Sequence, residues 1–337
     1  MNLTTKNYFN LALFSALIVL PLITENVSGG FYTLIATKSL IMALAAIGLN
    51  LLVGQGGLVS FGHSAFIGIG AYCVGVPLFH YFEDGTQWLA NGFVHLFLAL
   101  LVSGAVATLM GMISLRTRGI YFIMITLAFA QLLYYLTTGL ELYGGDDGLS
   151  LYQRSEFPGS FNLESNQTLY YLCLGSILIT LGFQYRWFHS RFGKLIQGAR
   201  INESRMKAIG YHLYPYQLVL FIVSGMICGY AGFLMANFNN FISPDLLHWQ
   251  HSGELLAIII LGGTRSIVGP LYGAAAFYLL EELLSSIDYT LGGIKIGEYW
   301  QLIFGPLLIF VVLYGHNGIY GFITGLDKPS VTPQRED

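Results

Sequence analysis

Charge is what this sequence has least of. Only 10% of its 337 residues are charged and 55% are apolar, with a mean hydropathy of +0.63. A water-soluble domain carries roughly 25% charged residues, so this chain cannot cover a water-exposed surface of ordinary size. Repeated apolar windows of about 17–25 residues indicate a polytopic membrane protein built as one all-α bundle. The short, strictly alternating segments of a membrane β-barrel are missing from the sequence.

Cysteine is scarce as well. Cys73, Cys173 and Cys228 lie in apolar segments, and their odd number and wide spacing fit neither a disulfide framework nor a CxxC motif. The eight histidines are scattered without the spacing of metal ligands. A GxxxxGK[ST] phosphate loop is also missing, because Gly193-Lys194 is followed by leucine. We expect no cofactor or metal on this chain, and any ATP-driven work must be done by another chain.

Acidic residues are nearly missing from the apolar segments. Glu254 and Glu281 lie toward the outer ends of theirs, where a wetted or snorkelling side chain is expected. A carrier driven by a proton or sodium gradient usually needs an acidic residue at membrane depth. The sequence therefore disfavours an ion-coupled carrier or channel.

The apolar windows predict about ten transmembrane segments. They fall at residues 8–24, 40–53, 58–81, 91–115, 119–140, 168–185, 215–239, 252–261, 267–287 and 299–314. The first window could be a signal peptide, but its long apolar run and the single preceding charge, Lys6, favour an uncleaved helix. We divide the chain into an amino-terminal helix with an outer connection (residues 1–39), a transmembrane domain (residues 40–315) and a cytoplasmic tail (residues 316–337). The transmembrane domain contains an outer polar loop (residues 141–167) and an inner loop (residues 186–212).

Positive charges are distributed unevenly about these segments. With ten crossings both termini lie on one side, and every Lys and Arg except Lys38, Arg154 and Lys295 falls on that side. Cytoplasmic loops of membrane proteins carry such an excess of positive charge. We therefore expect both termini and the inner loop to be cytoplasmic.

Two of the predicted segments are poor membrane spans. Residues 52–76 are interrupted by glycines and polar side chains, and a broken backbone at membrane depth needs protein or a watery cavity to satisfy its amide groups. Residues 252–261, ended by Gly262 and Gly263, are too short to cross a hydrocarbon core of about 30 Å. Two interrupted segments in a ten-segment chain are expected when inverted halves meet at a pathway.

The polar side chains of the first interrupted segment have two interpretations. Gln55 and Ser60 can bond backbone groups that the break sets free, and the glycines can let helices pack closely. His63 is of more interest, because an imidazole at membrane depth is costly unless it has a partner. We favour a structural role for these residues over direct contact with a substrate.

A serine beside a histidine also invites an enzymatic interpretation. Ser64 fails the Gly-x-Ser-x-Gly pattern, because Phe66 stands where glycine is required. The neighbouring His63 points to a different face of a helix, so the two residues are not a catalytic pair. An intramembrane serine protease would need a base from another helix, such as His95 or His251.

The inner loop is the longest connection expected on the cytoplasmic side. Its residues 192–209 are amphipathic, and four apolar side chains would share one side of a helix: Leu195, Ala199, Met206 and Ile209. Such a helix either rests on anionic lipid or docks into a partner protein, and composition does not choose between the two.

Four stretches of the sequence carry a family likeness. Residues 54–72, GQGGLVSFGHSAFIGIGAY, are the most specific. Residues 144–149 have the pattern GG-x-x-G-L, residues 192–210 form the inner-loop stretch, and residues 261–270 have the pattern LGG-x-x-S-x-x-GP. In this order they resemble the permeases of branched-chain amino acid ATP-binding cassette (ABC) importers, over about residues 40–315. The long outer polar loop is typical of the LivM type.

The resemblance implies a type II ABC importer-like permease bundle in a bacterial inner membrane. The implied partners are a second permease subunit in a heterodimer, two cytoplasmic ATPases that hold ATP and Mg, an extracytoplasmic substrate-binding protein and membrane lipid, with no nucleic acid. The implied substrate is a branched-chain or related hydrophobic amino acid. Permeases for urea, short amides and aromatic amino acids share these motifs and stay alternatives.

The resemblance also implies roles for individual residues. The translocation path and gate would include Gln55, Gly56, Gly57, Ser60, Gly62, His63 and Ser64. The residues that couple to an ATPase would be Phe192, Gly193, Arg200, Asn202, Glu203, Ala208 and Gly210. A structural turn would be formed by Gly262, Gly263, Gly269 and Pro270. On this interpretation the energy enters at the inner loop, some distance from the gate.

Overall fold

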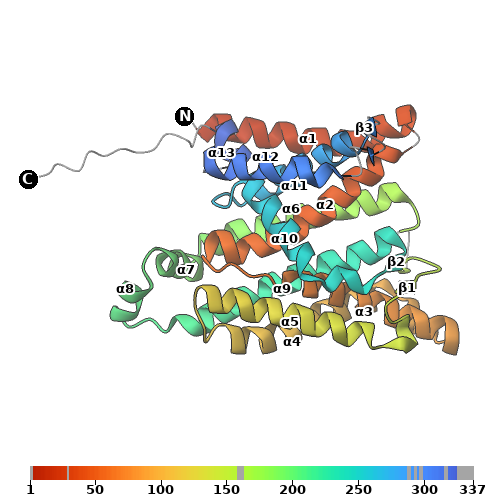
Figure 1. Cartoon of the computed structure of the whole chain (residues 1–337), viewed down its shortest axis with the longest axis horizontal. Helices are drawn as coiled ribbons and strands as arrows, with labels where there is room; N and C mark the ends of the chain where they lie inside the picture. The colour runs from red at the N-terminus through yellow and green to blue at the C-terminus, as the bar shows by residue number, and fades with distance from the viewer. Residues whose placement is uncertain are drawn as a thin grey trace, which may run out of the picture.

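The computed structural model describes residues 3–28, 30–157, 163–286, 290–291, 294–295, 299–314 and 318–324. Its helices lie side by side in one bundle (Figure 1). Helices α7 (Arg191–Ile201) and α8 (Glu203–Ala208) project from one end of the bundle, and the short strands lie at the other. We call these the inner-loop end and the strand end.

Among the described residues, six helices are long and apolar enough to cross a membrane. They are α2 (Phe31–Asn50) with its π-helical extension (Leu51–Gln55), α3 (His63–Asp84), α4 (Gly92–Ser114), α5 (Ile120–Thr138), α6 (Asn166–Phe188) and α9 (Leu213–Asn239). The other α-helices beside α7 and α8 are α1 (Leu3–Ser28), α10 (Trp249–Gly262), α11 (Gly269–Ser285), α12 (Trp300–Tyr314) and α13 (Gly318–Thr324). The chain is therefore a helical multi-pass membrane protein, and its ten crossings stay a prediction.

Helix α2 forms the centre of the bundle. Every residue from 40 to 52 is buried, and the helix contacts α6, α9, α10 and α11. A helix that is apolar on all sides is stable only when it is surrounded, which explains why this segment lacks a polar face.

The bundle contains two halves that pack in the same way. Helices α2 to α5 form one half and α9 to α12 the other, with α2 against α9 between them. Helix α3 packs on α4 as α10 packs on α11, and α4 packs on α9 as α11 packs on α2. Figure 1 shows α2 running from the strand end to the inner-loop end and α9 running back. The helix packing thus supports the inverted repeat expected from the two poor spans.

Small residues bring the helices of this repeat close together. A side chain at Gly70 of α3 would fall on the backbone of Gly229 in α9, and one at Gly232 would fall on the backbone of Ile67. In the other half, Gly273 of α11 lies against the backbone of Ile258 in α10. Glycine is needed at these positions because membrane helices associate through close backbone packing.

Short strands, which the sequence pattern did not predict, lie at the strand end. Strand β1 (Leu149–Ser150) pairs antiparallel with β2 (Phe241–Ile242), and β3 (Thr290–Leu291) pairs antiparallel with β4 (Ile294–Lys295). The first pair fastens the outer polar loop onto the connection between α9 and α10. Strands of two residues carry too little alternation to be recognised in a sequence.

The inner loop differs from the single amphipathic helix that we expected over residues 192–209. It forms α7 and α8, separated at Asn202, whose extended backbone (φ −155°) ends α7. The Asn202 side chain accepts from Arg205 N at 2.9 Å and so begins α8 as an N-cap. Because of this break, Ile209 leaves the apolar face and is 65% exposed, while Leu195 and Ala199 are buried against Leu213.

The predicted tail begins with a packed helix. Helix α13 contacts α10 and α11, and Gly318 lies against the backbone of Gly262 and Gly263. The remainder of the tail, residues 325–337, lies outside the described residues.

Candidate functional site

The first interruption, residues 56–62, separates α2 from α3 at the place expected from the sequence. The chain leaves α2 through the π-helical turn and reverses at Gly57, whose φ of +71° favours glycine. Gly56 N and Leu58 N donate to the carbonyls of Leu51 and Leu52 at 3.1 Å. Carbonyls of the π-helical turn thus satisfy backbone groups that an interrupted helix would otherwise leave without partners.

His63 begins α3, and its side chain is fully buried. Its Nδ1 lies 2.9 Å from Ser60 Oγ and its Nε2 lies 2.9 Å from Ser224 Oγ. The Ser224 hydroxyl donates to Gly48 O at 2.6 Å, so it accepts from His63 Nε2, and the ring accepts from Ser60 at Nδ1. His63 therefore joins α3 to α2 and α9, which is a structural role.

Ser64 joins the two halves of the bundle. Its backbone N–H donates to Ser252 Oγ at 2.9 Å, and the two hydroxyls lie 2.8 Å apart. The Ser64 hydroxyl donates in turn to Leu247 O at 3.2 Å. Both serines are fully buried, and they fasten the first turn of α3 to the first turn of α10.

The arrangement around Ser64 does not support the serine-protease interpretation. His95 bonds Ser155 Oγ at 2.8 Å and Leu89 O at 2.7 Å. His251 bonds acidic side chains instead. Within the part of the chain that the structure describes, neither histidine bonds the Ser64 hydroxyl, so a nucleophile has no base there.

Helix α7 lies directly against the first interruption. The Arg200 guanidinium donates to the Gly54 carbonyl, and Gln197 Nε2 donates to Gln55 Oε1 at 3.4 Å. A side chain at Gly57 would lie 2.9 Å from Arg200 Cγ. We expected the inner loop to lie some distance from the break; this expectation was wrong, because the fold places α7 on it.

The late glycine turn reaches the same place. Gly262 ends α10, Gly263 adopts φ +106°, and Pro270 lies in the first turn of α11. The Asn50 side chain of α2 donates to Ser266 O of this turn at 2.9 Å. Three motifs far apart in the sequence, the interruption, the inner loop and the late turn, thus meet at the inner-loop end.

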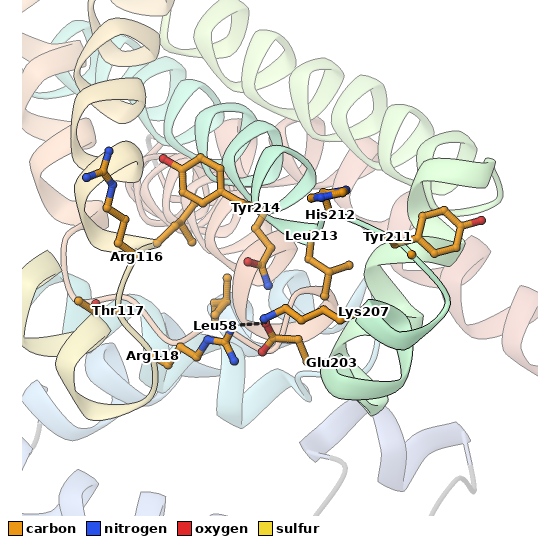
Figure 2. Close-up of a pocket in the computed structure, with 13 residues that line it drawn as sticks. Leu58, Arg116, Thr117, Arg118, Glu203, Lys207, Tyr211, His212, Leu213 and Tyr214 are labelled. Carbon is orange, nitrogen blue, oxygen red and sulfur yellow. Dashed lines mark ion pairs between the residues drawn. The ribbon is translucent and has the colours of Figure 1, made fainter.

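A cavity of about 460 Å³ lies beside α8 (Figure 2). Glu203 sits at its wall, with its Oε1 at 2.7 Å from Arg118 Nη2 and at 2.9 Å from Lys207 Nζ. Leu58 of the first interruption lines the same cavity. The pair with Arg118 therefore fastens α8 to the connection between α4 and α5, whereas the pair with Lys207 lies within α8.

Comparison with known proteins identifies the family. Residues 31–312 match the family described as branched-chain amino acid transport system / permease component. The chain belongs to this family. The LivM permease protein of the high-affinity branched-chain amino acid transport system of Salmonella typhimurium is 28% identical over 308 residues, 85% of this chain and 69% of that protein. Its Escherichia coli counterpart is 27% identical over 311 residues, with the same two shares, and no solved structure matches the chain.

The residues predicted to line the path of this permease differ in their surroundings. The side chains of Ser60, His63 and Ser64 are fully buried and hydrogen-bonded, so in this conformation they brace helices. Gln55 lines a cavity of about 710 Å³ that Gln197 also lines. Gly62 is buried, with the Thr126 carbonyl 2.7 Å from the position of a side chain.

The residues predicted to couple to an ATPase lie along α7, α8 and the turn after them. Phe192 stacks on Trp187 with ring centroids 5.1 Å apart, and Gly193 packs on the Phe188 backbone. Ala208 is exposed, and so is Gly210, whose φ is +97°. These residues therefore form an exposed rim over a packed base, and their coupling to an ATPase stays a prediction.

Two residues of the site were missed in the sequence. Asn50 and Ser224 are polar side chains within apolar helices, and both bond backbone across helices. Their signal was available, because a polar residue inside an apolar run needs a partner. Among the described residues, no group of three or more His, Cys, Asp or Glu side chains is arranged so that it could hold a metal ion.

Proposed function

We propose that this permease is a membrane subunit of an ABC importer for branched-chain or related hydrophobic amino acids. The names of its LivM relatives and the family match support this proposal. The hydrogen bond from Arg200 to the Gly54 carbonyl also supports the proposal, because it links the inner loop to the interrupted segment. A movement of the inner loop can then move that segment. ATP would be hydrolysed on separate ATPase chains, with Mg bound there.

We propose further that the chain crosses the membrane ten times, with the inner-loop end in the cytoplasm. The helices α1 to α6 and α9 to α12 supply the ten crossings, although α10, of 14 residues, is only about 21 Å long at 1.5 Å per residue. The basic residues Arg118, Arg200 and Lys207 all lie at the inner-loop end, as the positive-inside rule requires of a cytoplasmic face.

In this mechanism α7 and α8 dock into an ATPase. Movement of α7 acts on the first interruption through Arg200 and Gln197, and movement of α8 acts on the connection between α4 and α5 through Glu203. Closing one face and opening the other takes about 5.5 kcal/mol for a shift from 1:99 to 99:1, which ATP-driven association of two ATPases can supply.

The remaining partners are a second permease subunit and an extracytoplasmic binding protein. The strand end, where β1 and β2 fasten the outer polar loop, would face the binding protein. Substrate selection would rest mainly on that protein, because His63 and Ser64 of the predicted gate are engaged in hydrogen bonds with Ser224 of α9 and Ser252 of α10.

The coupling proposal is tested in the transporter reconstituted with its ATPases and binding protein. Arg200→Ala should lower ATP-dependent leucine uptake about tenfold or more, because a charge-assisted hydrogen bond of about 1.5–3 kcal/mol is lost, while the ATPases still co-purify. Arg186→Ala, an exposed arginine in the last turn of α6, is the matched control and should leave uptake unchanged. Normal uptake by Arg200→Ala would show that α7 does not act on the interruption.

The substrate is tested separately. Calorimetry of the binding protein with leucine, isoleucine, valine, phenylalanine and urea should show tight binding of the branched-chain amino acids. Tight binding of urea or phenylalanine alone would replace the substrate while leaving the importer mechanism in place. Uptake that survives loss of ATP but collapses with the proton or sodium gradient would overturn the mechanism.

A further inference from the structure

A second polar site lies away from the interruption and the inner loop. Four ionisable side chains from three helices line one cavity of about 140 Å³: Lys38 of α2, His251 and Glu254 of α10, and Glu281 of α11. Phe277 and Trp300 supply an aromatic wall. We call this the charged cavity. From the sequence we expect Glu254 and Glu281 to snorkel separately, whereas the fold places them on one cavity.

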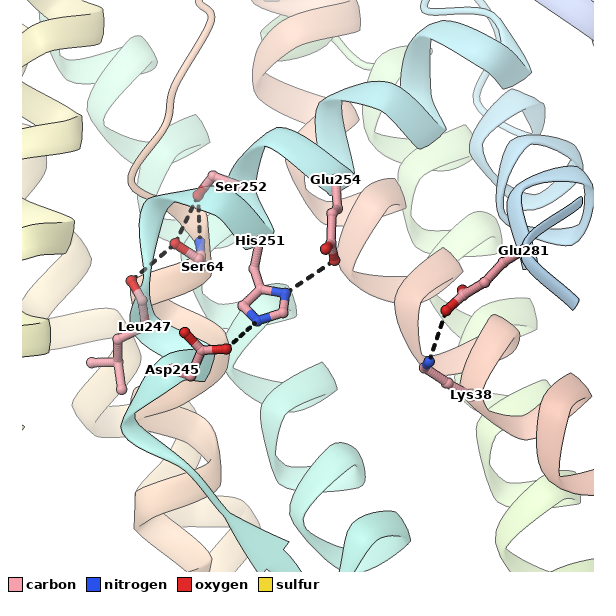
Figure 3. A network of polar contacts seen from close by, with 8 residues as sticks. All are labelled: Lys38, Ser64, Asp245, Leu247, His251, Ser252, Glu254 and Glu281. Carbon is pink, nitrogen blue, oxygen red and sulfur yellow. Dashed lines mark hydrogen bonds and ion pairs between the residues drawn. The ribbon is translucent and has the colours of Figure 1, made fainter. Parts of the chain in front are cut away.

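The charges of this cavity form one loose pair and one hydrogen-bonded pair (Figure 3). Lys38 Nζ lies 3.8 Å from Glu281 Oε1, at the edge of ion-pair range, and 4.9 Å from the centroid of the Tyr278 ring. His251 Nδ1 lies 3.0 Å from Glu254 Oε2, and its Nε2 lies 3.4 Å from Asp245 Oδ2. The side chains of Lys38, His251, Glu254 and Glu281 are 27–40% exposed, so a small ligand can reach them.

This arrangement suits a zwitterion with an apolar side chain. An α-carboxylate can take the place of Glu281 beside Lys38, and an α-ammonium can bind Glu254 or Glu281. With Asp245, which pairs with His251 beside the cavity, three carboxylates face two basic side chains, which disfavours ligands that carry negative charge alone. The aromatic wall can bury the hydrocarbon part of the ligand, as apolar pockets with a few convergent polar groups do.

Stability gives no reason to keep these charges together. Partly buried ion pairs lose much of their attraction to desolvation, and apolar replacements are often as stable. Ionisable groups that gather at membrane helices mark functional sites by default. The cluster is therefore better explained by a ligand than by folding.

The charged cavity also adjoins the contact between the two halves. His251 is followed by Ser252, which bonds Ser64 at the start of α3. Ile67 of α3 lines the cavity as well. A ligand in the cavity thus touches both α3 and α10, and its presence can bias how these two helices pack.

We propose that the charged cavity is a transient binding site for zwitterionic amino acids with apolar side chains during their passage through the permease. The proposal rests on the proposed function, whose substrate class it assigns to named residues. It locates the site on α2, α10 and α11, toward the strand end and next to the contact between Ser64 and Ser252.

The experiment uses the complete transporter in liposomes with its ATPases and binding protein. Lys38→Met and Glu281→Gln should each lower the maximal rate of leucine uptake about tenfold, because each removes one charge-assisted contact to the ligand. The affinity of the binding protein for leucine and the basal ATPase rate should not change. Asp84→Asn, which removes a strand-end charge that pairs with His80 outside the cavity, is the matched control.

A photoreactive diazirine analogue of leucine gives the direct readout. It should label peptides that contain Phe277 or Trp300 in the wild-type transporter, and Lys38→Met should abolish the labelling at an unchanged melting temperature. Excess leucine should compete with the probe, whereas isoamylamine, which lacks the carboxylate, should not.

Three results would overturn the proposal, and they differ. If the wild-type transporter takes up leucine and both variants keep most of that uptake, the charged cavity is not a ligand site while the proposed function stands. If the variants weaken docking of the binding protein instead of photolabelling, the cluster is a protein-docking surface. If the wild-type transporter takes up no apolar amino acid, the proposed function is wrong, and the ligand assigned to the cavity with it.

Discussion

The two interruptions of the bundle follow one packing plan and differ in chemistry. The first, residues 56–62, carries no charge, and its polar groups are closed by hydrogen bonds within the bundle. The second is the connection that precedes α10, residues 240–248, and not residues 252–261 as expected, because α10 is continuous over Trp249–Gly262; this connection contains Asp245 and lies beside the charged cavity. Arg200 of α7 contacts the Gly54 carbonyl at the first, whereas β1 clamps the second. The repeated packing sets where the helices are interrupted, and the local side chains determine the charge and the contacts of each interruption.

The largest expected effect comes from the helix contact on which both interruptions depend. Gly70→Leu should prevent assembly of α3 against α9, because its side chain would fall on the Gly229 backbone and overpacking costs about 1–3 kcal/mol or more. Size-exclusion chromatography in detergent should then show little monodisperse protein. Gly175→Leu on α6, with open space around it, should behave as wild type. Equal yields of the two variants would contradict the close packing of α3 on α9.

A smaller effect is expected inside the first interruption alone. Ser224→Ala removes the partner of His63 Nε2 and of Gly48 O, and leaving a buried polar group unpaired costs about 1–3 kcal/mol. The melting temperature of the purified transporter should fall. Ser103→Ala is the matched control, because this buried hydroxyl has no hydrogen-bond partner among the described residues. Equal melting temperatures would show that His63 does not brace the interruption.

The smallest effect is expected at the exposed end of the inner loop. Lys207→Ala removes one of the two cations that pair with Glu203, whose side chain keeps Arg118. A surface ion pair contributes about 0–1 kcal/mol, so the melting temperature should hardly change in low or high salt. A large fall in the melting temperature would mean that the pair between Lys207 and Glu203 stabilises α8 strongly. The proposed difference between a tightly bonded interruption and a weakly stabilised α8 would then be wrong.

Much of the local structure could be predicted from the sequence. The glycines and polar residues of 54–64 predicted the first interruption, which the structure places at 56–62. Gly262 and Gly263 predicted the end of α10, because glycine ends helices where a positive φ is needed. The inner-loop helix was predicted in position but not in its break, since Asn202 fits a helix interior as well as an N-cap until its partners are known.

What the sequence determined by itself is the class of the protein and its order of elements. Apolar runs without charges can only be membrane helices, because a soluble fold could not cover them with polar surface. The tertiary structure alone decided which distant residues meet. Arg200 and the Gly54 carbonyl are 146 positions apart, and Lys38 and Glu281 come from opposite ends of the chain. Such contacts depend on how whole helices cross, and that crossing is set by close backbone packing at glycines such as Gly70 and Gly232, which no local pattern specifies.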